Sequence, residues 1–449
     1  MPAEAMPHAL DASRFEACQD TDASGNALTA TIAVDWRGLC ALRAMLPHSS
    51  RTTDALPRGA VACLSLSAFG SGMSLRINDA LLPQLASEFG VTLGQASQVI
   101  SLFAIAYGLS QLLFGPLGDR FGKYRVIAWA TAACALAALA SALAPDFMML
   151  RLTRVLSGAT AAAIIPLAMA WIGDVVPYAQ RQPVLARFLI GQITGLSTGV
   201  WLGGFAADHL RWQAPYVLIA LLFAAASAAL FVLHRRLPPA ARKTVRMPGP
   251  AWRRMLSEFG QVLALRWARM LLLLVFFEGM CLYGPFAFVA SHVHQRFGLS
   301  LSSAGALVML FGLGGLLFAL SSRRLVQRLA ETGLARWGGA LMCLSLLVVA
   351  YAPVWGWVTL ACFVLGLGFY MLHNTMQVNA TQMAPERRGA AVSAFAACFF
   401  LGQSAGVSLG GLWVGSLGAS RFLALGALGL LAVSLVFAAR LGRQRRTEA

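Results

Sequence analysis

Residues 97–125 read SQVISLFAIAYGLSQLLFGPLGDRFGKYR, an apolar run that ends in a loop rich in glycine and basic side chains. A helix needs about 20 mostly apolar residues to cross the hydrocarbon core of a bilayer. Residues 97–117 meet that requirement, and Arg120, Lys123 and Arg125 then mark the point where the chain returns to water. The stretch therefore predicts a membrane-spanning helix, and similar units recur along the chain.

The composition extends this prediction to the whole sequence. Of 449 residues, 58% are hydrophobic and 12% are charged, whereas soluble domains are about 45–50% apolar and about 25% charged. The balance excludes a disordered chain, and eight cysteines in so long a sequence exclude a disulfide scaffold. We predict an all-α membrane protein with twelve transmembrane helices, at residues 59–82, 97–117, 125–143, 147–173, 187–206, 214–234, 269–291, 304–320, 334–352, 354–377, 390–412 and 421–440.

The basic residues lie almost entirely on one side of these helices. The net charge is +17, and 29 of the 35 Lys and Arg residues fall on the side that holds both termini, against Arg211, Arg296 and Arg421 on the other. Such a bias marks the cytoplasmic side. We therefore expect a multi-pass protein of the cell inner (plasma) membrane with both termini cytoplasmic. The charge indicates topology rather than nucleic-acid binding.

The sequence contains a weak internal repeat. Residues 89–93 (FGVTL) match residues 297–301 (FGLSL), and residues 191–199 (GQITGLSTG) match residues 402–410 (GQSAGVSLG). Parallel repeats are typical of transporters whose two halves move about a site at mid-membrane. We expect two pseudo-symmetric six-helix halves at 58–234 and 268–440, a polar, disordered cytoplasmic tail at 1–57, a basic cytoplasmic linker at 235–267 and a basic tail at 441–449.

The linker has a helical pattern of its own. Its second part places Trp252, Met255, Leu256 and Phe259 on one helical face. This pattern indicates either a short helix on the cytoplasmic leaflet or a solvated connection between the halves.

The loop after the second helix resembles the G-x-L-a-D-r-x-G-r-k signature of the major facilitator superfamily, and the resemblance extends over residues 58–440. It rests on Gly115, Gly118, Asp119, Arg120, Gly122 and Lys123. Glycines permit close helix approach and a tight turn, and the resemblance implies a cytoplasmic gate in which Asp119 pairs with basic groups. In the second half the repeat places Gln327 and Arg328 opposite Asp119 and Arg120, so we expect an asymmetric gate without its acidic member there.

Two further elements carry the resemblance. Arg154 and Gly158 match the family's R-x-x-x-G element, which is associated with proton coupling in proton-linked members. Gly191, Gly195, Gly199 and Gly203 resemble the antiporter motif that ends G-P-x-x-G-G, but Val200 replaces its proline. The spacing of these glycines, and of Gly402, Gly406 and Gly410 in the second half, favours tight helix packing whether or not the chain is an exporter.

Two carboxylates fall within the predicted spans. Glu278 lies about 13 Å deep in its helix, near the midplane. A buried carboxylate can carry a proton or pair with a cationic substrate, although a packed carboxyl without such a role is the simpler alternative. Asp79 lies near the outer end of the first helix, where we hypothesise a switchable pair with Arg154. Arg76, one turn away, is the competing partner, and an outer-rim ion pair is equally compatible with the pattern.

A group of polar residues occurs at membrane depth: Gln192, His373, Asn374, Gln377 and Gln403. They either line a cavity or hold helices together by hydrogen bonds. The sequence has no G-x-x-x-x-G-K-[ST] phosphate loop, no catalytic triad and no metal-ligand cluster. We expect no enzymatic activity, cofactor or metal. The expected partners are a small-molecule substrate, protons and the lipid bilayer, with the chain acting as a monomer.

These patterns together predict a secondary active transporter that works by alternating access. The resemblance is to the proton-linked drug and sugar efflux branch, which implies proton-coupled efflux of small amphipathic compounds or sugars. Glu278, Asp79 and Arg154 are the candidate proton-coupling residues. Two alternatives stay open: a proton-coupled uptake symporter for a sugar or organic acid, favoured by the missing proline at Val200, and a transporter-like sensor without a transport cycle.

Overall fold

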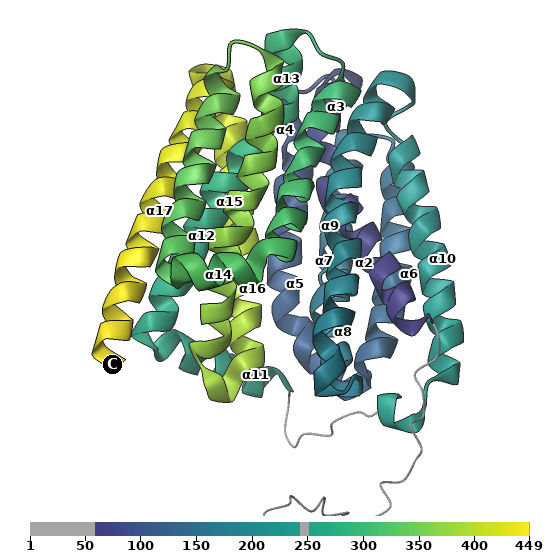
Figure 1. Cartoon of the computed structure of the whole chain (residues 1–449). Helices are drawn as coiled ribbons and strands as arrows, with labels where there is room; N and C mark the ends of the chain where they lie inside the picture. Colours follow the sequence, from purple (N-terminus) through teal and green to yellow (C-terminus); the bar gives the residue numbers. More distant parts are fainter. Residues whose placement is uncertain (1–58, 243–250, 449) are drawn as a thin grey trace, which may run out of the picture. The chain divides into compact units, whose positions relative to one another are not determined.

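The computed structural model describes residues 59–242 and 251–448, and within them every regular element is helical (Figure 1). The predicted all-α class is therefore confirmed, while the predicted tail at 1–57 lies outside the described residues. Ten helical segments there are long and apolar enough to span a membrane, or eleven if one bent pair counts as a single span. The exact number of twelve spans stays a prediction.

The first half of the chain forms one run of helices. The bent pair consists of α2 and α3, which meet at 46°. The elements are α2 (Ala60–Arg76), α3 (Asn78–Glu88), α4 (Leu93–Ala96), α5 (Gln98–Phe121), α6 (Lys123–Ala142), α7 (Phe147–Ala161), α8 (Ile164–Val175), α9 (Tyr178–His209), α10 (Ala214–Arg236) and η1 (Pro239–Arg242).

The second half begins after the undescribed residues 243–250. Its elements are α11 (Ala251–Ala264), α12 (Arg266–Phe286), α13 (Val289–Phe297), α14 (Leu301–Tyr351), α15 (Trp355–Gln382), η2 (Pro385–Arg387), α16 (Arg388–Leu417) and α17 (Ala419–Glu448). The linker thus contains a helix, α11, whose position on the cytoplasmic leaflet stays a prediction. The segment predicted as a basic tail continues α17.

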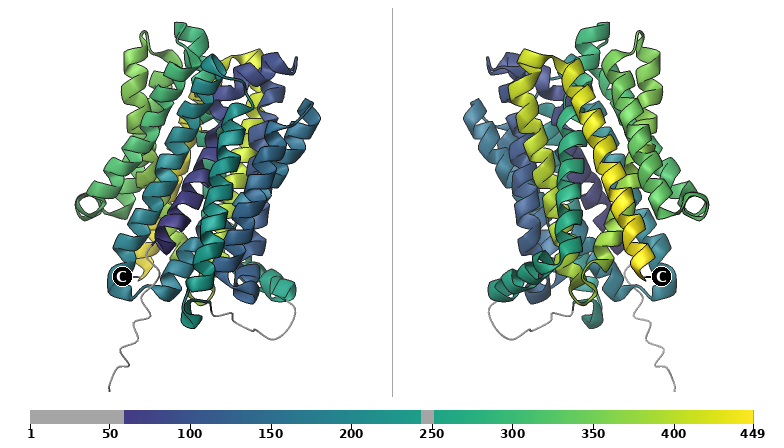
Figure 2. Two further views of the ribbon diagram at one scale, coloured as in Figure 1. Left: turned by 90° about the vertical axis from the view of Figure 1, so that its right-hand side faces the viewer. Right: turned by 90° about the vertical axis from the view of Figure 1, so that its left-hand side faces the viewer.

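Helix α14 combines two predicted spans. It has 51 residues, about 77 Å at 1.5 Å per residue, against a hydrocarbon core of about 30 Å. The helix breaks at Ala330, whose φ of 52° and ψ of 179° are not helical. Figure 2 shows a short green stretch of α14 end-on, at an angle to the helices that run along the bundle. The two arms of α14 correspond to the spans predicted at 304–320 and 334–352.

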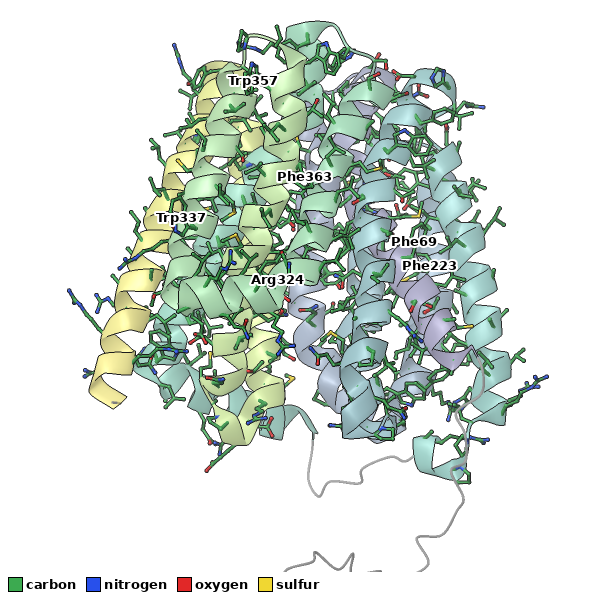
Figure 3. All side chains as sticks on the ribbon, viewed as in Figure 1. Phe69, Phe223, Arg324, Trp337, Trp357 and Phe363 are labelled. Carbon is green, nitrogen blue, oxygen red and sulfur yellow. The ribbon has the colours of Figure 1, made fainter. Side chains whose placement is uncertain are left out.

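The two halves repeat the same contacts. In the first half α2 packs on α9, and in the second α12 packs on α16. Between the halves, α9 packs on α14 and α5 packs on α16. Large apolar side chains such as Trp337 and Trp357 are exposed on the outside (Figure 3), where a bilayer would cover them.

Glycines bring the paired helices into backbone contact. A Cβ added at Gly191, Gly195 or Gly199 of α9 would overlap the α2 backbone, at Ser65, Phe69 and Met73 in turn, and one at Gly203 would overlap the backbone of Ile77, directly after α2. In the second half, a Cβ at Gly402 or Gly406 would overlap the α12 backbone at Phe276 or Met280, whereas Gly410 faces the rings of Phe288 and Phe422. Four-residue spacing on both partners keeps successive turns in register.

The halves meet closely at the end that the charge bias assigns to the outside. Asp208, near the end of α9, accepts hydrogen bonds from the backbone N–H groups of Leu301 (3.1 Å) and Ser302 (2.6 Å) and from the Ser302 hydroxyl (2.5 Å). It thereby caps the N-terminus of α14. Gly94 and Gly411 bring α4 and α16 into backbone contact at the same end. This arrangement closes that end of the bundle.

Candidate functional site

A buried ion pair lies where α2 bends into α3. Arg76 Nη1 and Asp79 Oδ2 are 3.2 Å apart, and both side chains are almost fully buried. The second carboxylate oxygen of Asp79, Oδ1, has no hydrogen-bond partner. The neighbouring residue, Asn78, is fixed by a hydrogen bond between its side-chain amide and the Tyr216 hydroxyl. Asp79 is therefore held inside the bundle with one oxygen free to bind a proton or a polar group.

The hypothesised pair between Asp79 and Arg154 is not present among the described ion pairs. Arg154 donates to the Ser74 carbonyl (2.7 Å) and the Val99 carbonyl (3.3 Å) and lies 4.3 Å from the Phe103 ring centre. Ser74 is in the last turn of α2, where carbonyls leave the helical hydrogen-bond ladder. Asp79 still attracts Arg154 electrostatically, but its direct partner is Arg76, because the (i, i+3) spacing places them side by side.

A second buried carboxylate lies in the other half. Glu278 of α12 is fully buried, and its Oε2 lies 2.9 Å from His373 Nδ1 of α15. Its Oε1 has no hydrogen-bond partner. The His373 ring packs against Phe369, Phe395 and Phe399, with ring centres 4.6–5.3 Å away. This carboxylate is thus enclosed by aromatic rings and contacts one group that can itself bind a proton.

Tyr283 connects the two pairs. The Arg76 guanidinium lies 3.7 Å from the centre of the Tyr283 ring, a cation–π contact between α2 and α12. The Tyr283 ring also packs edge-on against Phe369 and Phe399, two of the rings that enclose His373. A cavity of about 20 Å³, enough for about one water, lies beside Arg76 and Tyr283. We call Arg76, Asp79, Glu278, Tyr283 and His373 the central site.

The predicted cavity-lining residues lie at different places around this centre. Gln403 of α16 is fully buried, and neither atom of its side-chain amide has a hydrogen-bond partner. Gln192, Asn374 and Gln377 are partly exposed. Sequence analysis missed the contact of His373 with Glu278, because 95 positions separate them and no local pattern connects them.

The predicted gating motif forms the turn between α5 and α6. Gly122 has a φ of 89°, which favours glycine, and a Cβ at Gly118 would overlap Leu167. Lys123 Nζ lies 3.6 Å from Asp119 and 2.6 Å from Asp174 of α8. Asp174 was not predicted. Gly115 has open space around it, and Arg120 lies beside the Phe121 ring.

The second half has an acidic residue at the corresponding turn, although Gln327, as expected, stands at the position of Asp119. At the repeat offset of 208, Ala330 corresponds to Gly122 and Glu331 to Lys123. Glu331 pairs with Arg445 of α17 (2.6 Å) and accepts a hydrogen bond from Asn379 of α15 (3.1 Å). The comparison of Gln327 with Asp119 missed it because the acidic residue is displaced by one helical turn. The two turns therefore differ in charge, because Lys123 in the first half corresponds to Glu331 in the second.

Comparison with known proteins identifies the family. The family model "Major Facilitator Superfamily" matches residues 64–407, about three quarters of the chain. The chain belongs to the Major Facilitator Superfamily. It is 24% identical over 335 residues to the uncharacterised MFS-type transporter YceJ of Bacillus subtilis (strain 168), covering 74% of this chain and 83% of YceJ. It is 32% identical over 149 residues to the multidrug export protein EmrB of Escherichia coli (strain K12), covering 33% of this chain and 29% of EmrB.

Solved structures share the same fold. A POT family transporter in complex with a thioalcohol conjugated peptide has a TM-score of 0.72 at 13% identity, over 86% of this chain and 96% of that one. A point mutant of the nucleoside transporter NupG has a TM-score of 0.68 at 16% identity, over 85% of this chain and 98% of that one. This major facilitator chain is therefore a multi-pass membrane protein of a transporter family, and the resemblance inferred from its motifs is confirmed.

Proposed function

We propose that this major facilitator protein is a proton-coupled exporter of small amphipathic compounds, with Glu278 as the proton-binding group. The observation that carries the proposal is the environment of this carboxylate: it is fully buried, one oxygen contacts His373 and the other has no partner. An ionised carboxylate in such a place is costly unless a proton or a cation compensates it. The partial match to the export protein EmrB supports export over uptake.

The pairing of Glu278 with an imidazole makes the site switchable. A guanidinium stays charged under all physiological conditions, whereas an imidazole gains or loses its proton near neutral pH. A proton delivered to the Glu278–His373 pair therefore changes the net charge of the central site by one unit. Tyr283 lies between the two pairs, because its ring contacts the Arg76 guanidinium and packs against Phe369 and Phe399, which enclose His373.

The central site also couples proton binding to the relative movement of the two six-helix halves. Arg76 belongs to α2 and Tyr283 to α12, so their contact joins the two six-helix halves. A change in charge at Glu278 alters the field at this contact. In alternating access such a junction is remade in each conformational state, which makes it a suitable place for coupling. Asp79 and Arg154 contribute by fixing the charge around Arg76.

The test measures transport by full-length protein in proteoliposomes across a panel of amphipathic compounds. An imposed pH gradient should drive accumulation, and Glu278→Gln should reduce it at least ~100-fold while substrate exchange at equal pH persists, because the variant cannot bind the coupling proton. Glu386→Gln, which removes an exposed carboxylate, is the matched control and should behave as wild type. Undiminished proton-driven accumulation by Glu278→Gln would refute the role of this residue.

The same experiment separates the alternatives. Export predicts accumulation against the proton flow, while a symporter would move substrate and protons in one direction, so the gradient is imposed in both orientations. A sensor without a transport cycle would give no flux with any compound. Infrared spectroscopy adds a readout that needs no substrate: a protonated carboxyl band should decrease in Glu278→Gln and stay in Glu386→Gln.

A further inference from the structure

A second cavity lies in the C-terminal half, at the end that the charge bias assigns to the cytoplasm. Its volume is about 570 Å³, and it is formed by the first turn of α12 and the last turns of α15 and α17. We call it the C-half pocket. Its wall includes Arg266, Trp267, Asn379, Gln382 and Arg445. Arg266 precedes Glu278 by 12 positions on α12, or about 18 Å, so the pocket is separate from the central site.

The chemistry of the pocket favours an anion. Arg266 and Arg445 supply two guanidinium groups, which bind phosphate oxygens by paired hydrogen bonds. Asn379 and Gln382 add amide groups that donate hydrogen bonds. The acidic group next to this wall is Glu331, which reaches Arg445 at 2.6 Å and Asn379 at 3.1 Å. A carboxylate therefore already occupies part of the donor set that a phosphate would use.

An apolar stripe that starts at Arg266 favours a lipid as the source of the anion. Arg266, Met270, Leu273 and Phe277 recur at spacings of four, three and four residues, so they form one stripe along α12. Leu273 is 56% and Phe277 38% exposed, although both lie within a span where the exposed surface meets lipid. Trp267 lies at the foot of the stripe, the depth at which indole rings mark the membrane interface. Acyl chains along the stripe would place a headgroup at Arg266.

We propose that the C-half pocket binds the headgroup of an anionic phospholipid of the cytoplasmic leaflet. Arg266 and Arg445 hold the phosphate, and the acyl chains lie along Met270, Leu273 and Phe277. The phosphate competes with Glu331 for Arg445. Lipid binding therefore weakens the ion pair between Glu331, at the turn of α14, and Arg445, near the end of α17. The mobility of the α14 turn then depends on the surrounding membrane.

The experiment uses full-length protein in nanodiscs of phosphatidylcholine with a small fraction of phosphatidylglycerol, followed by native mass spectrometry of the lipids that it retains. We expect preferential retention of phosphatidylglycerol. Each of Arg266→Gln and Arg445→Gln should weaken it about fivefold, the usual contribution of one basic residue at an anionic surface. The double variant Arg323→Gln/Arg324→Gln removes two arginines of α14 that do not line the pocket. It is the control and should change retention less than about twofold, because neither arginine reaches the proposed headgroup.

Two further measurements make the proposal falsifiable even if an arginine variant misfolds. Glu331→Gln removes the competitor, so it should strengthen retention of phosphatidylglycerol about fivefold, an effect opposite to general destabilisation. Unchanged or weaker retention would refute the proposed competition between Glu331 and the lipid phosphate for Arg445. Inorganic phosphate, added at the same concentration as the lipid, should not displace phosphatidylglycerol. Displacement by phosphate alone would assign the pocket to a soluble anion and overturn the lipid assignment, as would equal loss in the control variant.

Discussion

The two halves of the molecule differ in the partner of their buried carboxylate and in the residue at one turn. Inside the bundle the first half pairs its buried carboxylate, Asp79, with an arginine three residues away, whereas the second pairs Glu278 with His373 from another helix. At the turn after α5 the first half has Gly122, where the second half has Ala330. At the repeat offset of 208, Asp79 corresponds to Ala287 and Glu278 to Gly70, so the repeat preserves the helices but not the positions of the buried carboxylates. One carboxylate is paired with a guanidinium and the other with an imidazole.

The largest expected effect comes from removing the fixed cation. Arg76→Gln leaves the fully buried Asp79 without its partner, and a buried pair broken in this way loses about 3 kcal/mol of stability. His373→Gln keeps a hydrogen bond to Glu278, so it should cost about 1 kcal/mol. Thermal unfolding in detergent measures both. The double variant Arg76→Gln/Asp79→Asn should recover more than half of the loss, and equal losses for the two single variants would contradict the distinction between the pairs.

The next effect concerns the turn between α5 and α6. Gly122→Ala introduces a Cβ at a φ of 89°, which should cost about 2 kcal/mol because side chains rarely adopt this backbone conformation. The same substitution at Gly115, which has the open space that a Cβ needs, is the control and should be close to neutral. If the Gly122 variant unfolds at the same temperature as the Gly115 variant, the turn does not require glycine.

At the corresponding turn of α14 we expect a substitution to change the free energy of unfolding in the opposite direction. Ala330 holds a φ of 52° and a ψ of 179°, a region that glycine enters at little cost. Ala330→Gly should therefore stabilise the protein by about 1 kcal/mol, even after the loss of chain entropy that glycine carries in the unfolded state. Differential scanning fluorimetry in detergent detects such a gain. A lower unfolding temperature for Ala330→Gly would show that the turn is not strained.

The smallest expected effect concerns the ion pair between Glu331 and Arg445, which follows this turn. A double-mutant cycle with Glu331→Gln and Arg445→Gln should give a coupling energy of about 0.5 kcal/mol, because both side chains are partly exposed. The coupling should decrease at high salt and in the presence of phosphatidylglycerol. A coupling that is indifferent to anionic lipid would separate this pair from the C-half pocket.

Local sequence patterns predicted much of this architecture. Hydropathy located the apolar segments now found in α2 to α17, the charge bias predicted their orientation, and glycine spacing indicated tight packing of the kind that α9 makes with α2. The burial of Glu278 also followed from counting residues along one helix. Other features depend on distant residues: His373 beside Glu278, Asp174 beside Lys123, and Asp208 at the start of α14. A single sequence carries no local signal for such contacts, since the packing of different helices creates them.

The preference of Asp79 for Arg76 shows a different limit. Both Arg76 and Arg154 were candidate partners in the sequence, and either pairing satisfied the depth argument. Asp79 stays beside Arg76 at the (i, i+3) spacing, and Arg154 instead binds the Ser74 carbonyl at the end of α2, next to the bend. A bend of 46° between two helices is a property of packing, and residue spacing alone did not indicate it.

The hydrogen bonds by which Asp208 caps α14 contribute to the free energy that is needed to open this closed end of the bundle. Its hydrogen bonds to Leu301 and Ser302 lie at the edge of the bundle, where water can replace each one at a net loss of about 1 kcal/mol. Three such bonds set a minimum of about 3 kcal/mol for separating α9 from α14, and the contact of Gly94 with Gly411 at the same end adds to it. Outward opening would thus be a sparsely populated excursion that a substrate or a proton could readily promote. Spin labels on α3 and α14 would report a larger open fraction in Asp208→Ala.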